Sequence, residues 1–111
     1  FYACRYFMAN GHWQIYNWSA DKKDDQDGNA DCFAIEDVPE KVMKAALKSA
    51  KIMGKGLYGI DIKEVEGKAL VIEINDNPNI DFGVEDGLYG DLVYNTILTS
   101  LKDRLNSKQE L

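Results

Sequence analysis

Two neighbouring segments near the middle of the chain alternate between apolar and polar residues, and this pattern predicts a β-hairpin. They comprise residues 57–65 and 69–75, with Glu66-Gly67-Lys68 between them. Strict alternation is typical of strands that bury one face and expose the other. A glycine in the short connection suits a tight turn. We therefore expect the two strands to pair in antiparallel fashion.

Burial also predicts which residues of this hairpin lie opposite one another. The isoleucines of both strands must share one face to form a continuous apolar surface. The tightest pairing that meets this condition places Val65 opposite Ala69 across a three-residue loop. The same register sets Asp61 opposite Glu73, and Asn75 follows on the same polar face.

A second hairpin is predicted at the start of the chain. Residues 2–9 are rich in aromatic side chains and are followed by Asn10-Gly11, a dipeptide that favours a two-residue turn. We expect residues 12–18 to return as the partner strand. Residues 21–31 are rich in aspartate and poor in apolar side chains, so they predict a mobile, solvated loop.

Helical periodicity predicts two helices. The first opens near Asp37, where Asp37 and Glu40 have capping-box spacing and Pro39 sits in the first turn, and it ends at Gly54. The second runs from about residue 87. Their apolar faces comprise Val42, Met43, Ala46, Leu47, Ala50 and Met53 in the first, and Leu88, Leu92, Val93, Ile97, Leu101 and Leu105 in the second.

These elements predict an α+β fold, an antiparallel β-sheet with two helices on one face. The 111 residues allow a single unit, and 45% hydrophobic and 29% charged residues are typical of a globular chain. A formal net charge of -6 excludes a nucleic-acid binder that needs a basic face. No apolar run approaches the ~20 residues that a membrane span requires, so no membrane partner is expected.

The cysteines and the first residues bear on the setting of the protein. Cys4 and Cys32 have no CxxC spacing and no histidine cluster beside them, so we expect reduced thiols in a cytoplasmic protein rather than a disulfide framework or a zinc site. Phe1 enters strand-like sequence directly, without an initiator methionine or a signal-peptide pattern. We therefore expect a fragment of a longer chain.

The polar face of the central hairpin is the candidate for chemistry. Asp61, Glu73 and Asn75 would converge as an all-oxygen set, which suits a hard cation such as Mg²⁺. An ordinary solvent face of a sheet, with Lys63 and Lys68 as counter-charges, explains the same acids equally well on spacing alone.

The residues that follow resemble a known family. Gly59-Ile60-Asp61 followed by Glu73-Ile74-Asn75-Asp76-Asn77-Pro78 resembles the distal half of the ATP-grasp ligases, and residues 75–86 resemble the RimK-like branch, which is akin to glutathione synthetases. The resemblance implies that residues 1–111 are the C-terminal part of an ATP-grasp domain whose ATP-clamping N-terminal part is absent.

The same resemblance implies cofactors and site residues. Mg²⁺ (or Mn²⁺) bridging the phosphates of ATP would be bound by Asp61, Glu73 and Asn75. Asn75 and Asn77 would contact the cofactor. Arg5 would be a catalytic, phosphate-binding residue, although an edge-strand arginine that packs its stem on Tyr or Phe is at least as good an interpretation.

The implied activity is that of a carboxylate–amine ligase. ATP would phosphorylate a carboxylate to an acylphosphate, and an amine would displace the phosphate to form an amide; the fragment alone is expected to be inactive. The expected partners are an amino-acid substrate, a small-molecule or peptide amine acceptor, the missing part of the chain and, through exposed surfaces, a second copy. Acidic side chains around the substrate loop predict a cationic acceptor. These are Asp76, Asp81, Glu85 and Asp86.

Two departures from the family pattern leave an alternative open. Asn79 stands where family members often carry glycine, and residues 21–31 replace a segment that often holds phosphate-binding arginines. The alternative is a non-catalytic nucleotide-binding, metal-binding or protein-interaction module that keeps the ATP-grasp fold.

Overall fold

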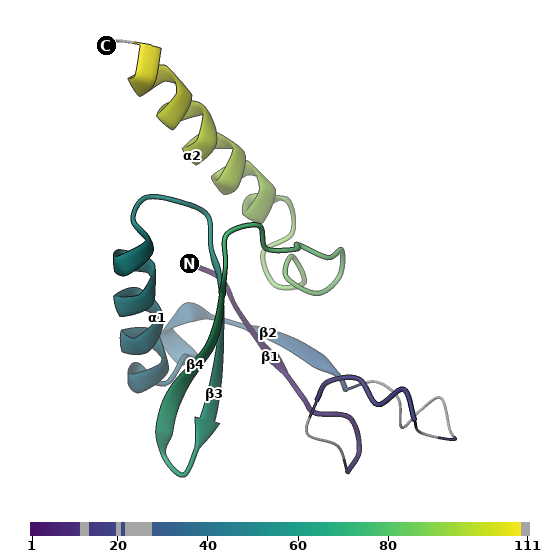
Figure 1. Ribbon diagram of the computed structural model, residues 1–111. Helices are drawn as coiled ribbons and strands as arrows, with labels where there is room; N and C mark the ends of the chain where they lie inside the picture. Colours follow the sequence, from purple (N-terminus) through teal and green to yellow (C-terminus); the bar gives the residue numbers. More distant parts are fainter. Residues whose placement is uncertain (12–13, 20, 22–27, 110–111) are drawn as a thin grey trace.

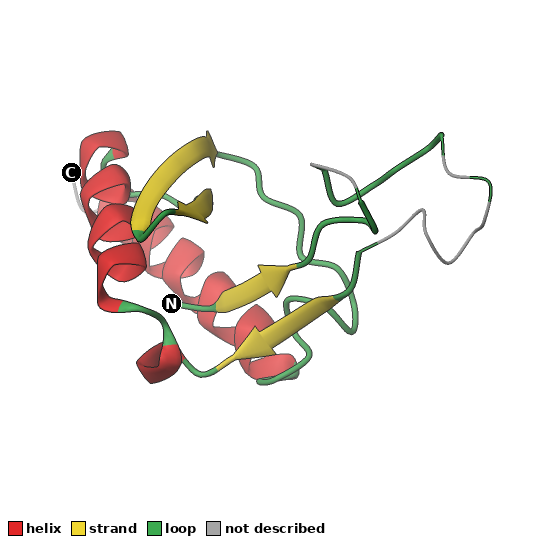
Figure 2. Cartoon of the chain, turned by 90° about the horizontal axis from the view of Figure 1, so that it is seen from below, coloured by secondary structure: helices red, strands yellow, loops and turns green. Residues whose placement is uncertain are grey.

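The computed structural model describes residues 1–11, 14–19, 21 and 28–109. The described elements, in chain order, are β1 (Ala3–Tyr6), β2 (Ala30–Phe33), the 3-10 helix η2 (Ile35–Asp37), α1 (Glu40–Met53), β3 (Gly59–Val65), β4 (Lys68–Asn75) and α2 (Asp91–Gln109). β1 pairs with β2 and β3 with β4, both antiparallel, and α1 packs against the β3–β4 hairpin (Figures 1 and 2). The α+β class is confirmed, but two small sheets replace the single predicted sheet.

The partner of β1 differs from the prediction. β1 pairs with β2, so the predicted pairing with residues 12–18 is wrong. The turn at residues 10–11 is present, and the Ala9 N–H donates to the Gln14 carbonyl at 2.9 Å. The Gly28 N–H donates to the Ile15 carbonyl at 2.8 Å, so the returning chain lies beside the segment that leads into β2. Residues 12–13 of the predicted strand lie outside the described residues.

The aspartate-rich segment is only in part the loop that the sequence predicts. Residues 22–27 lie outside the described part of the chain. Ala30 and Asp31 belong to β2, where they pair with Tyr6 and Arg5, so the prediction of a loop is wrong at this end. Their strand conformation follows from backbone pairing with β1, which composition alone does not reveal.

The β3–β4 hairpin combines a tighter turn than predicted with a β-bulge. Val65 pairs with Lys68, not with Ala69, across a two-residue turn. Glu66 and Gly67 there have φ of 49° and 77°. Two positive φ values are typical of a type I′ turn, whose twist matches that of a hairpin. The bulge shifts the register between Asp61 and the next residue, so Asp61 lies opposite Glu73 and this pairing is confirmed.

The first helix ends as predicted but begins differently. Pro39 is the N-cap of α1 without a side-chain cap hydrogen bond, and Asp37 lies in η2, so the predicted capping box is wrong. The Pro39 carbonyl instead accepts hydrogen bonds from the Val42 and Met43 N–H groups. At the other end Gly54 has a φ of 91°, which glycine adopts without strain.

The second helix does not pack on a sheet as predicted. It begins at Asp91, later than expected, because Gly90 with a φ of 53° and the Gly90 N–H bond to the Asp86 carbonyl form a turn ahead of it. Val93 is buried, but Leu92 and Leu105 are 56% and 65% exposed. α2 extends away from the sheets (Figure 1).

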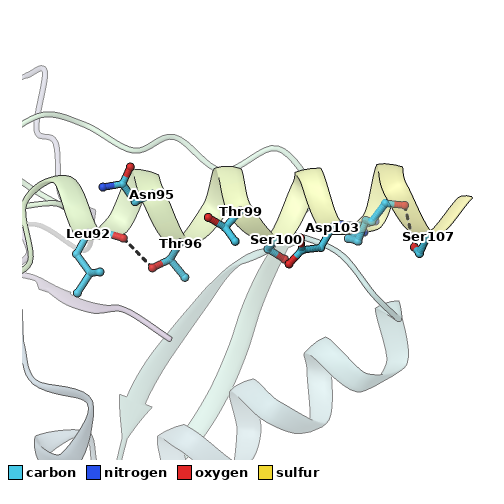
Figure 3. A pocket seen from close by; sticks show the side chains of 8 residues that line it. Leu92, Asn95, Thr96, Thr99, Ser100, Asp103 and Ser107 are labelled. Atoms are coloured by element: carbon cyan, nitrogen blue, oxygen red, sulfur yellow. Dashed lines mark hydrogen bonds between the residues drawn. The ribbon is translucent and has the colours of Figure 1, made fainter. Parts of the chain in front are cut away.

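A shallow groove of about 660 Å³ follows the side of α2 (Figure 3). Side chains that line it include Leu92, Asn95, Thr96, Thr99, Ser100 and Asp103. Arg104 from the same groove donates to the Lys55 carbonyl at 3.0 Å, which ties the helix to the connection after α1. Neither this helix nor another described one combines the length and the apolar character of a membrane span.

Candidate metal centre

The central hairpin brings the two predicted acidic ligands together. Asp61 on β3 and Glu73 on β4 are direct cross-strand partners, and their side chains therefore project from the same face. Both are exposed. Ile60 and Ile74, the next pair along the ladder, are partly buried and project from the opposite face, where α1 packs. The acids thus lie on the solvent side of a hairpin that α1 supports from behind.

The third predicted ligand lies at the end of β4. Asn75 pairs with Gly59, two residues beyond Glu73 on the same face. Its Oδ1 accepts a hydrogen bond from the Asn77 N–H at 2.9 Å. This bond turns the chain out of the strand and fixes the amide, and a carbonyl oxygen retains a second lone pair for a further partner. Asn77 contributes its backbone to this turn, and its side chain is exposed.

Gly59 has a steric role beside this turn. A Cβ at position 59 would lie 2.9 Å from the Pro78 Cβ and 3.9 Å from the Asn75 Cβ. The first distance is too short for two carbon atoms. Glycine therefore allows the proline of the Glu-x-Asn-x-x-Pro motif to lie directly against the beginning of β3.

Substituting Gly59→Ala is expected to displace the loop around Pro78 and to lower the free energy of unfolding by about 1–3 kcal/mol, the cost of overpacking. Chemical denaturation measures the loss, and NMR shifts of the Asn75 and Asn77 amides report the displacement. Gly67→Ala is the control, because a Cβ there meets nothing within 4 Å and its cost is that of positive φ alone. Unchanged Asn77 shifts in Gly59→Ala would contradict the steric role.

Two carboxylates and one amide oxygen form a donor set that fits a magnesium ion held jointly with phosphates. In the described part of the chain no group of three or more His, Cys, Asp and Glu side chains could hold a metal ion. Mg²⁺ typically takes one or two protein carboxylates and completes its octahedron with water and nucleotide phosphates. The two carboxylates and the amide oxygen of the hairpin match the protein part of such a donor set.

Arg5 lies on β1, in the other sheet. Its guanidinium carbon is 5.2 Å from the centroid of the Phe33 ring, and its backbone pairs with Asp31. This is the aromatic packing that the sequence offered as the other interpretation of Arg5. A phosphate-binding role for Arg5 stays a prediction.

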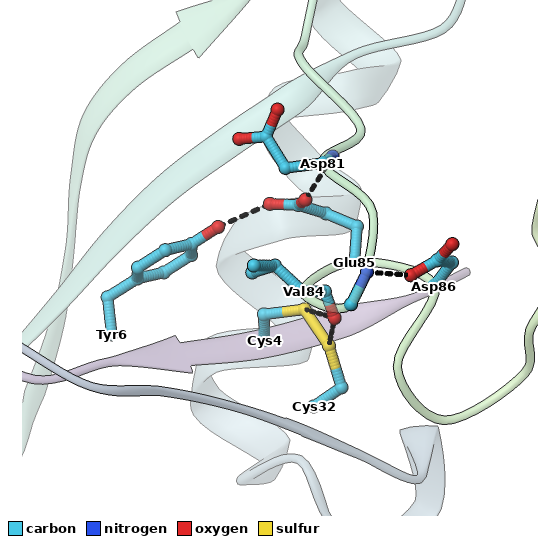
Figure 4. The surroundings of a disulfide bond; sticks show 8 residues. Cys4, Tyr6, Cys32, Asp81, Val84, Glu85 and Asp86 are labelled. Carbon is cyan, nitrogen blue, oxygen red and sulfur yellow. Dashed lines mark hydrogen bonds between the residues drawn. A yellow bond between two sulfur atoms is a disulfide. The ribbon is translucent and has the colours of Figure 1, made fainter.

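Sequence reasoning missed a network that holds the loop between β4 and α2. The Tyr6 hydroxyl hydrogen-bonds to Glu85 Oε1, and Glu85 Oε2 accepts from the Asp81 N–H at 2.7 Å (Figure 4). Burial, followed by the hydrogen bond and the charge of Glu85, raises the pKa of Tyr6 above its ordinary value. Asp86 is buried and accepts from the Gly83 N–H at 2.5 Å.

Asp86 also accepts a hydrogen bond from the Tyr94 hydroxyl at 2.9 Å. This bond, together with burial and the charge of Asp86, raises the pKa of Tyr94. Glu85 and Asp86 therefore hold the loop, so the prediction of a cationic acceptor rests on Asp76 and Asp81 alone. No spacing rule connects Tyr6 with Glu85, which lie 79 positions apart.

Tyr6→Phe is expected to lower the free energy of unfolding by about 0.5–1.5 kcal/mol, the net value of a hydrogen bond. Because the folded-state pKa of Tyr6 is raised, this contribution is fully present below pH ~10 and is lost as the pH rises through the folded-state pKa. Urea unfolding at several pH values measures it. In a Glu85→Gln background the same substitution should cost clearly less, and equal costs in both backgrounds would contradict the coupling.

The two cysteines form a disulfide, which contradicts the expectation of reduced thiols. Cys4 and Cys32 are cross-strand partners of β1 and β2, with Cα atoms 4.1 Å apart (Figure 4). The expectation rested on the absence of CxxC spacing and of a histidine cluster, and neither bears on two cysteines that strand pairing brings together. An even number of cysteines was the signal in the sequence.

Comparison with protein-family models, with curated proteins and with solved structures gives no match to this chain. The ATP-grasp resemblance therefore rests on the motif residues alone.

Proposed function

We propose that this chain carries the cation-binding hairpin of an ATP-dependent carboxylate–amine ligase of the ATP-grasp, RimK-like kind. The observation that supports this most is the direct opposition of Asp61 and Glu73 at the start of the Glu-x-Asn-x-x-Pro motif. The bulge beside Asp61 strengthens the argument. Without it the two-residue turn would set Asp61 opposite Ile72, and the two acids would not be partners.

The placement of the motif supports binding rather than packing. Asp61, Glu73 and Asn75 all lie on the exposed side of the hairpin, and neither acid takes part in a described salt bridge. Directly opposed like charges destabilise a strand pair by roughly 0.2–1 kcal/mol, and a divalent cation reverses the sign of that interaction.

In the proposed reaction Asp61, Glu73 and the Asn75 amide would hold Mg²⁺ together with the phosphates of ATP. When bound, the ion would neutralise negative charge on the phosphoryl group that is transferred. The turn that Asn77 and Pro78 form keeps the motif loop next to the acids. A substrate carboxylate would attack the γ-phosphorus of ATP, the bond from that phosphorus to the bridging oxygen would break, and ADP would leave. An amine would then attack the acylphosphate, displace inorganic phosphate and lose a proton to give the amide.

The proposal assigns this activity to a longer protein and places it in the cytoplasm, where ATP is available. Residues 1–111 would supply the cation site, and a preceding part would clamp the adenine and cover the phosphates. In a reducing cytoplasm a disulfide such as Cys4–Cys32 is maintained only as a reversible state.

Isothermal titration calorimetry of the full-length protein with an ATP analogue carrying a non-hydrolysable β–γ bridge tests the proposal. We expect binding in the presence of Mg²⁺ and at least about a tenfold loss of affinity when EDTA removes it. Absence of nucleotide binding at saturating Mg²⁺ would contradict the ligase function. Cation binding without nucleotide binding would instead support the non-catalytic module.

A further inference from the structure

One face of β1 holds the loop that links β4 to α2. Tyr2, Cys4 and Tyr6 alternate along β1 and therefore share a face. The Tyr2 ring packs edge-on against Tyr89 with centroids 5.6 Å apart, and its hydroxyl donates to the Leu92 carbonyl at 3.3 Å. Tyr6 holds Glu85 of the same loop.

The sulfur atoms lie at the centre of this contact. The Val84 carbonyl oxygen faces the sulfur atoms of Cys4 and Cys32 (Figure 4). In the sequence Cys4 lies midway between Tyr2 and Tyr6. Cys32 projects from the same face as Cys4 because the two are cross-strand partners. Both cysteines are only partly buried. The loop thus packs directly against the disulfide through the Val84 carbonyl.

We propose that Cys4–Cys32 is a reversible redox-modification site that controls how firmly residues 81–92 are held on β1. Two molecules of a low-molecular-weight thiol reduce the pair by exchange. The Cys4–Cys32 S–S bond breaks, each cysteine sulfur gains a proton, and the two small thiols leave joined as their own disulfide. Re-oxidation by that small disulfide reverses each step. This inference does not rest on the proposed ligase function.

Reduction is expected to loosen the loop. β1 and β2 pair over only four residues each, and the disulfide is the covalent link between them. Reduction creates two S–H groups that can donate to the Val84 carbonyl, but a thiol is a weak donor. Loss of the cross-link is the larger effect, because it frees Cys32 to move away from Cys4 and from the loop above.

Amide hydrogen exchange of the full chain in buffers of oxidised and reduced glutathione tests the proposal. The reporters are Gly83, Gly87 and Gly90, whose N–H groups bond to Asp86 Oδ1, the Val84 carbonyl and the Asp86 carbonyl. We expect their exchange to become at least about tenfold faster on reduction, and to accelerate more than exchange of the β3–β4 ladder, which reports the loss of global stability. Unchanged reporters in protein that mass spectrometry shows to be fully reduced would overturn it. So would equal acceleration throughout the chain, or a disulfide that millimolar glutathione does not reduce.

Two matched double variants separate the cross-link from the S–H donor. Cys4→Ser with Cys32→Ser keeps a hydrogen-bond donor at each position without the cross-link, and Cys4→Ala with Cys32→Ala keeps neither. We expect fast exchange in both variants, independent of the glutathione ratio. Wild-type slow exchange in the serine variant alone would mean that the donor holds the loop, which would overturn the proposal. Slow exchange in both variants would overturn it as well.

Discussion

Replacing Glu73 by Gln is expected to weaken the binding of Mn²⁺ or Mg²⁺ at the central hairpin by about 10- to 100-fold. The substitution keeps the size of the side chain and removes one of two opposed carboxylates, so the cation loses half of the formal charge that the hairpin supplies. Asp61→Asn should have an effect of the same order, because the two residues are cross-strand partners. Titration followed by Mn²⁺ electron paramagnetic resonance measures the affinity.

Glu66→Gln is the matched control for this loss. Glu66 is exposed, lies in the turn of the same hairpin, and its substitution removes the same single charge. We expect its affinity for Mn²⁺ to stay within about twofold of wild type, since screening over the length of the hairpin leaves little long-range effect at physiological salt. Equal losses of Mn²⁺ affinity in Glu66→Gln and Glu73→Gln would show that only the net charge of the hairpin matters, and would contradict a defined site.

Removing the Cys4–Cys32 disulfide is expected to lower the free energy of unfolding by roughly 3–4 kcal/mol. The cysteines are 28 positions apart, and in the chain-entropy model the closure of such a loop stabilises the folded state by that amount. This contribution is a large fraction of the total free energy of unfolding of this chain. Only Ala9 and Val93 are fully buried apolar residues in the described part of the chain, so the apolar core contributes little.

Urea unfolding of the oxidised protein, of the protein in dithiothreitol, and of Cys4→Ser with Cys32→Ser measures this effect. The reduced wild type and the double variant should agree, because both lack the cross-link. The double variant should also be insensitive to dithiothreitol. Equal midpoints for oxidised and reduced wild type would show that the disulfide contributes no stability.

Local patterns predicted the hairpin that carries the candidate site. Alternation over residues 57–75 identified both strands, and the expectation of one apolar face placed Asp61 opposite Glu73. The apolar face itself is wrong, because Ile62 pairs with Val71 and Leu70 with Lys63. The route to that pairing was wrong. Val65 pairs with Lys68 instead of Ala69, and a β-bulge after Asp61 then restores the predicted register. The type I′ geometry of Glu66-Gly67 is therefore more favourable than an uninterrupted ladder.

Contacts between distant segments could not be predicted in the same way. β2 is four residues long and begins inside the aspartate-rich segment, so no periodic pattern marks it. The pairing of Tyr6 with Glu85 joins two positions with no shared local signal. The stripe of leucines on α2 predicted a buried face, but periodicity shows only that such a face exists and not what covers it.

The central claim is that Asp61, Glu73 and Asn75 bind one divalent cation, and paramagnetic broadening by Mn²⁺ in ¹⁵N-resolved NMR spectra of this chain tests it most directly. At substoichiometric Mn²⁺ we expect the amide signals around residues 61, 73 and 75 to broaden first and to recover when excess Mg²⁺ is added. Broadening confined to the aspartate-rich residues 21–31, with the hairpin signals unaffected, would contradict the claim.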